Sequence, residues 1–402
     1  MAPGARPKGM ARNNGQLSWA LACAALLAVA TLAAGCSPAR GARSSGASAS
    51  ADSGSAPRVP AASPGAAGQP SQFISLRLEP RRLRASHPAS YLEVAVSDST
   101  TGAIVRRLLP ASRDGMRVTG LALDRSGNLW ITYSRGPVYR GDTEGGDPRP
   151  DSCGNMIAIL QAGTGRVTTF LRTGDSVLIS GAAPSPDGRL LAYGESGCAT
   201  GYFDSYLRVT DLSARRSWTI GQGLARCHLI TDPSWSTDGR ALIVGYAPAA
   251  EPAYSGPQGT CPQPRRERLV SVAAGAAQPG LTGAAAEADP GCEITSAAGA
   301  AGGGILAVET CGREGYLMGR ARLLVLSPRL GLVRRFTLGR CTDGNELSPD
   351  RSGQSVLVSA YLYCNPPGRP GPVTRLWSYT GGALRLITSV PGDAMGVSLM
   401  TW

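Results

Sequence analysis

The sequence predicts an all-β fold: a six-bladed β-propeller with four-stranded blades, whose ring is closed by pairing of the N- and C-terminal strands. Three observations indicate this fold: a recurring Asp-Gly turn, a second kind of hairpin that recurs six times, and a composition rich in turn residues. The chain of 402 residues contains 53 Gly and 30 Pro, while aromatic residues make up 5%. Such a composition is typical of many short strands joined by many turns.

The first repeat is a turn framed by apolar residues, in which Asp accepts backbone N–H groups and Gly adopts a positive φ. We expect each copy to join strand A, the innermost strand of a blade, to strand B, the next one outward. Four copies, and a fifth in which glycines replace the Asp-Gly turn, lie at 123–130, 184–193, 235–243, 347–357 and 299–308.

The second repeat consists of two alternating apolar strands around a glycine or small turn, and we expect it to join strands C and D. Its six copies are Tyr91–Leu109, Asn155–Leu171, Tyr206–Ile220, Arg268–Leu281, Arg322–Leu338 and Arg375–Val390. The turns lie near Gly102, Gly165, Ala214, Gly275, Gly331 and Gly382, so successive turns are 49 to 63 residues apart. This spacing matches a four-stranded blade with its loops.

The two ends of the chain together supply the strands of one further blade. Asp393–Trp402 aligns with a strand A, Gln72–Leu78 is suited to strand B, and the hairpin 91–109 supplies strands C and D. Such a blade removes the open edges that a linear stack of sheets would leave.

The segment from Ser185 to Tyr193, Ser-Pro-Asp-Gly-Arg-Leu-Leu-Ala-Tyr, resembles the WD40-like (PD40-type) repeat of TolB-like six-bladed propellers. The resemblance covers residues 72–402, and the segment 118–132 is similar to NHL-type propeller repeats. Both resemblances imply the fold and not an activity, because propellers carry many different functions.

The first 36 residues are predicted to be a lipoprotein signal peptide. Three basic residues precede an apolar run over 17–34, and Leu32-Ala33-Ala34-Gly35-Cys36 resembles a bacterial lipobox with Cys36 as the lipidation site. The alternatives are plain cleavage with secretion and an uncleaved membrane anchor, since the apolar run is just long enough to span a bilayer.

Residues 37–71 are rich in Ser, Ala, Gly and Pro, and we expect them to form a disordered tether with an r.m.s. span of roughly 30 Å. Residues 72–402 then form the propeller. The predicted location is the extracytoplasmic side of the cell membrane, with the membrane as a partner through the lipid anchor.

The charge of the chain argues against one class of partner. Of the 40 Lys and Arg residues, three lie in the signal peptide, which leaves 37 against 28 Asp and Glu and a net charge of +9. This charge favours anionic headgroups or wall polymers. It is scattered, without a basic block interleaved with aromatic residues, so no nucleic-acid partner is expected.

Eight cysteines lie in the exported domain, where disulfides are expected. Three of them precede a strand A and three lie in the B–C loop of the same blades, while the last two lie in B–C loops of adjacent blades. The predicted pairs are Cys227–Cys261, Cys292–Cys311, Cys341–Cys364 and Cys153–Cys198. Metal binding by thiolates is the weaker interpretation, because the chain has no Cys-x-x-Cys and only two histidines, His87 and His228.

Candidate binding residues come from the alignment of the blades. Equivalent positions of strand A carry a hydroxyl, and carboxylates lie five residues earlier, where strand A begins. A ring of carboxylates at a channel mouth can hold Ca²⁺ on the axis or a cationic ligand; the simpler interpretation is that each Asp caps a turn. The hydroxyl residues are Thr119, Ser180, Thr231, Thr295 and Ser398, and the carboxylates are Asp114, Asp175 and Asp393.

No catalytic residue and no cofactor other than this Ca²⁺ is predicted, because nucleophile, nucleotide and zinc motifs are absent from the sequence. We therefore expect a lipid-anchored binding or interaction module on the outer face of the cytoplasmic membrane, which docks an envelope protein, a peptide or a small ligand. The alternative is a metal-dependent hydrolase or lyase that uses carboxylates at the channel mouth. A purely structural envelope component is a third interpretation.

The expected ligand site lies on the membrane-distal face of the propeller, which carries the D–A and B–C loops. Function concentrates on long loops that a rigid scaffold holds in place.

Overall fold

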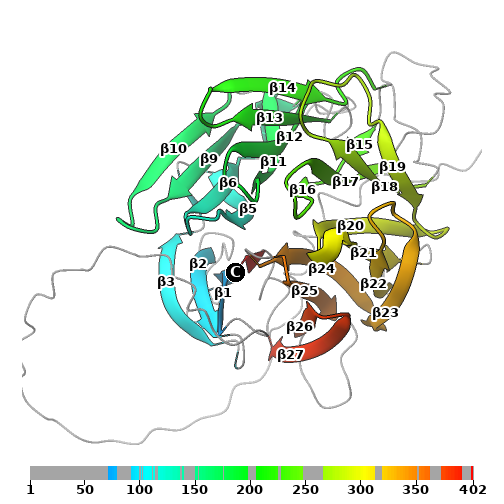
Figure 1. The fold of residues 1–402 in the computed structure, drawn as a ribbon. Coiled ribbons are helices and arrows are strands. Elements are labelled where there is room, and N and C mark those ends of the chain that lie inside the picture. Colours follow the sequence, from blue (N-terminus) through cyan, green and yellow to red (C-terminus); the bar gives the residue numbers. More distant parts are fainter. Residues whose placement is uncertain are drawn as a thin grey trace, which may run out of the picture. The chain divides into compact units, whose positions relative to one another are not determined.

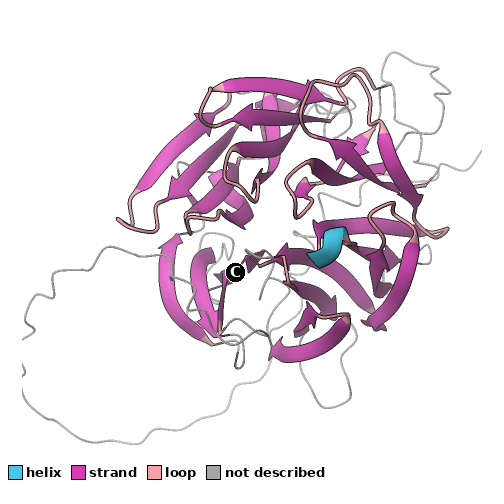
Figure 2. Ribbon diagram, viewed as in Figure 1, coloured by secondary structure: helices cyan, strands magenta, loops and turns pink. Residues whose placement is uncertain are grey.

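Six antiparallel sheets are arranged in a ring in the computed structural model of this protein (Figure 1). The structure describes residues 71–78, 92–98, 101, 103–110, 112–113, 116–135, 138–139, 150–152, 154–174, 176–197, 205–224, 228–247, 266–312, 319–350, 353–362, 373–391 and 400–401. Within these ranges the only helical segment is the 3-10 helix η3 (Ala301–Gly303), and none is long and apolar enough to cross a membrane (Figure 2). The predicted all-β six-bladed propeller is therefore confirmed.

Each blade contains four strands, which run in order from the inner strand A to the outer strand D. Blade I contains β28 (Met400–Thr401), β1 (Gln72–Leu78), β2 (Leu92–Asp98) and β3 (Ile104–Pro110). Blade II contains β5 (Met116–Leu123), β6 (Leu129–Ser134), β9 (Asn155–Leu160) and β10 (Val167–Arg172). Blade III contains β11 (Val177–Pro184), β12 (Leu190–Gly197), β13 (Tyr206–Asp211) and β14 (Arg216–Ile220).

In blade IV, strand A is divided into β15 (Leu229–Ile230) and β16 (Ser234–Trp235), and β17 (Ala241–Ala247), β18 (Arg268–Ala273) and β19 (Gly283–Glu287) follow. Blade V contains β20 (Cys292–Gly299), β21 (Ile305–Cys311), β22 (Arg320–Leu326) and β23 (Leu332–Arg340). Blade VI contains β24 (Thr342–Pro349), β25 (Ser355–Leu362), β26 (Val373–Thr380) and β27 (Ala383–Pro391). Three short strands are additional: β4 (Ser112–Arg113) pairs with β5, and β7 (Val138–Tyr139) pairs with β8 (Pro150–Ser152).

Blade I combines strands from both ends of the chain. Strand β28 pairs with β1, so that Thr401 lies opposite Ile74. The same short strand contacts β5 and β24, the inner strands of the two neighbouring blades. The Thr401 hydroxyl accepts a hydrogen bond of 3.1 Å from the backbone N–H of Leu123 in blade II. Met400 and Thr401 thus lie at the strand A position of blade I, and the rest of the predicted strand, 393–399 and Trp402, lies outside the described residues.

The Asp-Gly turns form for the predicted reason. The Asp124 carboxylate accepts backbone N–H groups of Ser126 and Asn128 at 2.8 and 2.9 Å. In blade III the Asp187 carboxylate accepts the N–H of Arg189 at 3.0 Å, and Gly188 has φ 74°. These local bonds reverse the chain between strands A and B without help from the rest of the protein.

The hydrophobic core lies between the faces of adjacent blades. One cluster joins blades I and II, with Ile74 and Leu129 among its fully buried members, and another joins blades V and VI. All eight residues of β25 are buried. Each sheet is therefore apolar on both faces along its middle strands, as in a stack of packed sheets.

One predicted hairpin differs from the structure. The sequence placed the C–D turn of blade IV near Gly275 and ended strand D at Leu281, whereas strand D is β19, which begins at Gly283. The intervening segment binds to blade III instead: Gln278 donates its N–H to Thr219 and accepts the N–H of Gly221. Pro279 has no N–H to donate to a regular strand pairing within blade IV, which favours the position of this segment beside blade III.

Among the described residues, the predicted disulfide Cys292–Cys311 is present. Its setting corrects the expectation in one respect, because the two cysteines face each other across β20 and β21 instead of connecting loops. Cys341 is also disulfide-bonded, with a partner outside the described residues. The remaining cysteines lie outside those residues, so their pairing stays a prediction: Cys153, Cys198, Cys227, Cys261 and Cys364.

Candidate functional site

A cavity of about 280 Å³ lies between the inner strands of the six blades. Residues from β5, β11, β16, β20, β24 and β28 line it, together with residues of several A–B turns. These are the strands nearest the centre of the ring in Figure 1. The cavity therefore occupies the part of the central channel that leads toward the A–B turns.

A β-bulge interrupts the inner strands at equivalent positions. Such a bulge adds one residue to a strand and changes the direction of its side chains. The register shifts lie between Val118 and Gly120, between Ser180 and Ala183, between Ile294 and Ser296, and between Gly344 and Glu346. In blade IV, the break between β15 and β16 falls at the same place.

The four described members of the predicted hydroxyl set lie at these bulges, and most of them bind the backbone of strand B: Thr119, Ser180, Thr231 and Thr295. The Thr119 hydroxyl donates to the carbonyl of Thr132 at 3.5 Å. The Thr231 hydroxyl accepts the N–H of Gly245 at 2.7 Å, and the Thr295 hydroxyl lies 3.4 Å from the carbonyl of Val308. These contacts give the hydroxyls a structural role beside strand B.

Several predicted site residues lie outside the described residues, namely Asp114, Asp175, Asp393 and Ser398, and so do His87 and the lipidation site Cys36. The carboxylate ring at the channel mouth and its Ca²⁺ therefore remain predictions. His228 is described: it is buried and its Nε2 lies 2.5 Å from the carbonyl oxygen of Ser205. This contact gives His228 a structural role beside the backbone of Ser205.

Four residues of the cavity wall directly follow predicted hydroxyl residues in the sequence: Gly120, Gly181, Asp232 and Ser296. Glu346 lines the cavity beside the corresponding bulge of blade VI, and the predicted residue Thr295 lines the cavity itself. The alignment of the blades placed the predicted hydroxyl residues in strand A, and it did not anticipate the bulge beside which the next residue lines the cavity.

Asp232 is the most distinctive member of this set, because its side chain crosses from blade IV to blade III. It is accessible from the channel and accepts a hydrogen bond from the Ser180 hydroxyl. It also packs against Gly181, where an added Cβ would lie 2.5 Å from Cγ of Asp232. Gly181 has φ 38°, a conformation that favours glycine, so the sequence of blade III makes room for this carboxylate.

Further contacts fix the surroundings of Asp232. The indole N–H of Trp235 donates to the carbonyl of Ala183 at 2.8 Å, which ties blade IV to the bulge of blade III. On the other side of that bulge, the N–H of Ala182 donates to the buried Thr132 hydroxyl of blade II at 3.2 Å. The Asp232 carboxylate thus packs against the bulge of blade III, and hydrogen bonds from blades II and IV fix the backbone of that bulge.

The protein around the channel changes the acidity of Asp232. Desolvation by the surrounding protein raises the pKa of this carboxyl above its ordinary value of 3.8, and the hydrogen bond from Ser180 lowers it in part. The other charged side chains that line the cavity are Glu346 and Asp350 of blade VI and Arg125 of blade II. Three carboxylates against one guanidinium give the lining an excess of negative formal charge.

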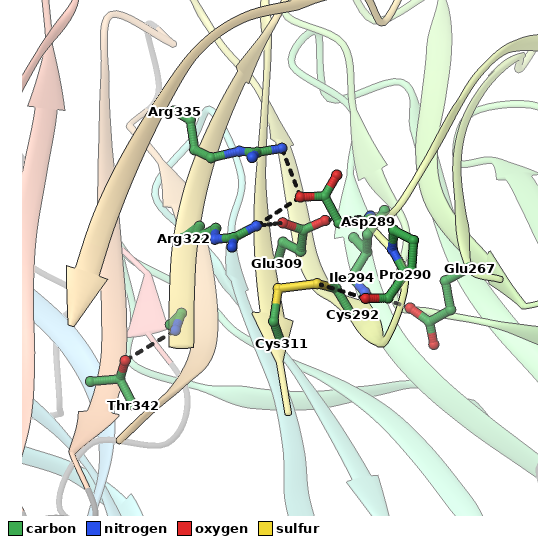
Figure 3. Close-up of a disulfide and its surroundings, with 11 residues drawn as sticks. Glu267, Asp289, Pro290, Cys292, Ile294, Glu309, Cys311, Arg322, Arg335 and Thr342 are labelled. Carbon is green, nitrogen blue, oxygen red and sulfur yellow. Dashed lines mark hydrogen bonds and ion pairs between the residues drawn. A yellow bond between two sulfur atoms is a disulfide. The ribbon is translucent and has the colours of Figure 1, made fainter. Parts of the chain in front are cut away.

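A second polar cluster surrounds the disulfide of blade V (Figure 3). Arg322 lies 2.8 Å from Asp289 and 3.3 Å from the buried Glu309, and Arg335 lies 3.0 Å from Asp289. The two sulfur atoms near Glu309 are bonded to each other, so they are not thiolate ligands for a metal ion. The charges in this cluster neutralise one another, and we assign it a structural role.

Proteins similar to this chain are found among solved structures and not by sequence. No family model matches the sequence, and no curated protein matches it. A protein of unknown function from Bacteroides caccae is similar in structure over 82% of this chain and 98% of its own, with a TM-score of 0.48 and 12% identity.

Two peptidases are also among the similar structures. Prolyl oligopeptidase B from Galerina marginata matches 81% of this chain and 43% of its own, with a TM-score of 0.44 and 11% identity. Pyrococcus horikoshii acylaminoacyl peptidase matches 67% of this chain and 39% of its own, with a TM-score of 0.39 and 12% identity. This chain therefore spans less than half the length of either peptidase.

Proposed function

We propose that this protein is a lipid-anchored, extracytoplasmic binding module whose ligand site is the central channel of the propeller. The observation that carries the proposal is the cavity of about 280 Å³, which inner strands of all six blades line. Concave sites with a few fixed polar groups are the usual places for ligands. In this channel the fixed groups include the Asp232 carboxylate, which is held by Ser180 and Gly181 of the adjacent blade.

The anchor in this proposal rests on the sequence from Leu32 to Cys36, which resembles a lipobox. Labelling of growing cells with a radioactive fatty acid tests it. We expect the wild-type protein to take up the label and the Cys36→Ala variant to remain unlabelled. If the wild-type protein is unlabelled and is found in the medium, the protein is secreted and has no lipid anchor.

A channel-filling substitution tests the ligand site. Ser234 lines the cavity, so the indole of Ser234→Trp should occupy much of its volume. The matched control is Ala214→Trp, which places the same side chain on the exposed C–D turn of blade III. Both variants are compared with wild type for cooperative thermal unfolding, so that a loss of binding is not mistaken for a loss of fold.

The measurement is the set of molecules that co-purify with the tethered protein from intact cells, identified by mass spectrometry. We expect the wild type and Ala214→Trp to retain the same bound molecule and Ser234→Trp to lose it. If Ser234→Trp is folded and retains that molecule as well as the wild type does, the channel is not the ligand site.

A further inference from the structure

We propose that the channel binds the cationic group of a small molecule, an amidinium, guanidinium or ammonium, against the carboxylate of Asp232. This inference rests on the proposed function and names the chemical class of the ligand. Three features of the described residues support it: the way Asp232 is held, the charge of the channel, and the space opposite the carboxylate.

The first feature is the fixed position of the carboxylate. Asp232 precedes Pro233, which restricts the backbone before it to an extended conformation. Its side chain lies on Gly181, and the Ser180 hydroxyl donates a hydrogen bond to it. A carboxylate with one such donor still has lone pairs for a bidentate cation. The groups that hold it belong to two blades, so little ordering is needed when a ligand arrives.

The second feature is the sign of the charge. The whole chain carries a formal net charge of +12, yet three of the four charged side chains that line the cavity are acidic. Among the described residues no ion pair joins Asp232 to an arginine, and the carboxylate is accessible from the channel. A ligand cation would provide the missing partner in a charge-assisted hydrogen bond.

The third feature is the space that the other blades leave free. At the positions equivalent to Asp232, blades II and III carry Gly120 and Gly181. Neither residue has a side chain that extends into the cavity. The wall also includes Ala122 and Ala183, which are suited to the uncharged part of a small ligand. A flat, compact cation of the size of benzamidine therefore fits both the charge and the volume.

Isothermal titration of the purified propeller tests the proposal with two probes of equal shape, benzamidine, which is cationic, and benzamide, which is neutral. We expect wild type to bind benzamidine at least tenfold more tightly than benzamide. Asp232→Asn, which removes the charge and keeps the shape, should lose that preference. Glu287→Gln is the matched control: it removes a carboxylate of the same blade at the outer strand β19, and it should bind both probes as wild type does.

The outcomes separate this inference from the proposed function. Equal binding of the two probes by wild type, no binding of benzamidine, or an unchanged preference in Asp232→Asn would overturn the cationic ligand. If Ser234→Trp still loses its co-purified molecule in that case, the channel remains the ligand site and only the ligand class is wrong. If folded Ser234→Trp retains that molecule, the proposed function itself fails. A preference of the wild type for benzamidine would then show that the purified protein can bind a cation, but not that the channel holds the ligand found in cells.

Discussion

The seam between blades III and IV and the seam between blades V and VI have the same position in the propeller but differ in how they use polar groups. Between blades V and VI, the Ser296 hydroxyl accepts the backbone N–H of Leu347 at 3.1 Å, so the polar groups of the seam satisfy each other. Between blades III and IV, Gly181 occupies the position of the serine, and the carboxylate of Asp232 from blade IV lies against it. The first arrangement contributes to stability, whereas the second places a charge where a ligand can reach it.

The largest effect is expected at the seam that the chain ends form. Deletion of Asp393–Trp402 removes β28, its pairing with β1 and the hydroxyl that accepts the N–H of Leu123. Blade I then has no inner strand, and an exposed strand edge favours aggregation. We expect loss of cooperative thermal unfolding, measured by circular dichroism. If the truncated protein is soluble and its thermal unfolding is unchanged, the seams between blades III and IV and between blades V and VI do not depend on the strand that the C-terminus supplies.

The next largest effect is expected for Gly181→Ala, which disrupts the packing between blades III and IV. The new Cβ would lie 2.5 Å from Cγ of Asp232, and alanine disfavours the φ of 38° at this position. We expect a loss of about 2–3 kcal/mol in the free energy of unfolding, measured by urea denaturation.

The double variant Gly181→Ala with Asp232→Gly is the control for that experiment. It removes the colliding side chain and leaves the backbone strain, so it should recover part of the loss. Additive effects of the two substitutions would mean that Asp232 does not lie on Gly181.

A smaller effect is expected for Ser296→Ala in the seam between blades V and VI. The substitution leaves the N–H of Leu347 without its acceptor, which costs about 1–2 kcal/mol when the group is removed from water. The matched control is Ser213→Ala on an exposed C–D turn, which should change the free energy of unfolding by less than about 0.5 kcal/mol. Equal effects of the two substitutions in urea denaturation would contradict the contrast between the seams.

The smallest effect depends on pH and distinguishes two carboxylates of blade IV. The pKa of Asp232 is raised by desolvation, so the folded protein retains this proton at pH values where the unfolded chain has lost it. The resulting stabilisation is complete below the ordinary pKa of 3.8 and is lost as the pH rises through the folded value. Asp232→Asn stays neutral, so it should have a higher melting temperature than wild type at pH 8 and nearly the same one at pH 4.

Asp238 should behave in the opposite way. Hydrogen bonds from the Ser236 hydroxyl and the N–H of Arg240 lower the pKa of Asp238 in the A–B turn, so its stabilisation is present at neutral pH and is lost as the pH falls below 3.8. Asp238→Asn should therefore melt at a lower temperature than wild type at pH 8, with a smaller difference at low pH. If both variants shift in the same direction at pH 8, the contrast between the channel and the turn is wrong.

The parts of the fold that short stretches of sequence determine could be predicted. The turns at Asp124 and Asp187 form through bonds between residues two to four positions apart, and the C–D hairpins follow from alternation of apolar residues. The segment around Gln278 could not be placed, because its hydrogen bonds connect it to a strand of the preceding blade. Its position depends on contacts that no local pattern records.

The candidate site was predictable only in outline, because its geometry depends on the bulges. The alignment brought Thr119 and Ser180 to equivalent positions of strand A, and both residues lie in inner strands, β5 and β11. It gave no reason to choose Asp232, since the contact of this side chain with Gly181 joins two blades. The carboxylates expected at the other end of strand A, Asp114 and Asp175, lie outside the described residues.

The bulges also change the interval between apolar residues in the sequence of the inner strands. A regular strand with one buried face repeats its apolar residues every second position. Four inner strands of this protein instead contain one pair of buried residues three positions apart: Val118 and Leu121, Ile179 and Ala182, Ile230 and Pro233, and Ile294 and Ala297. In all four strands the second of the two residues enclosed by the pair lines the cavity, so the odd interval in the sequence marks a channel-facing position of a blade.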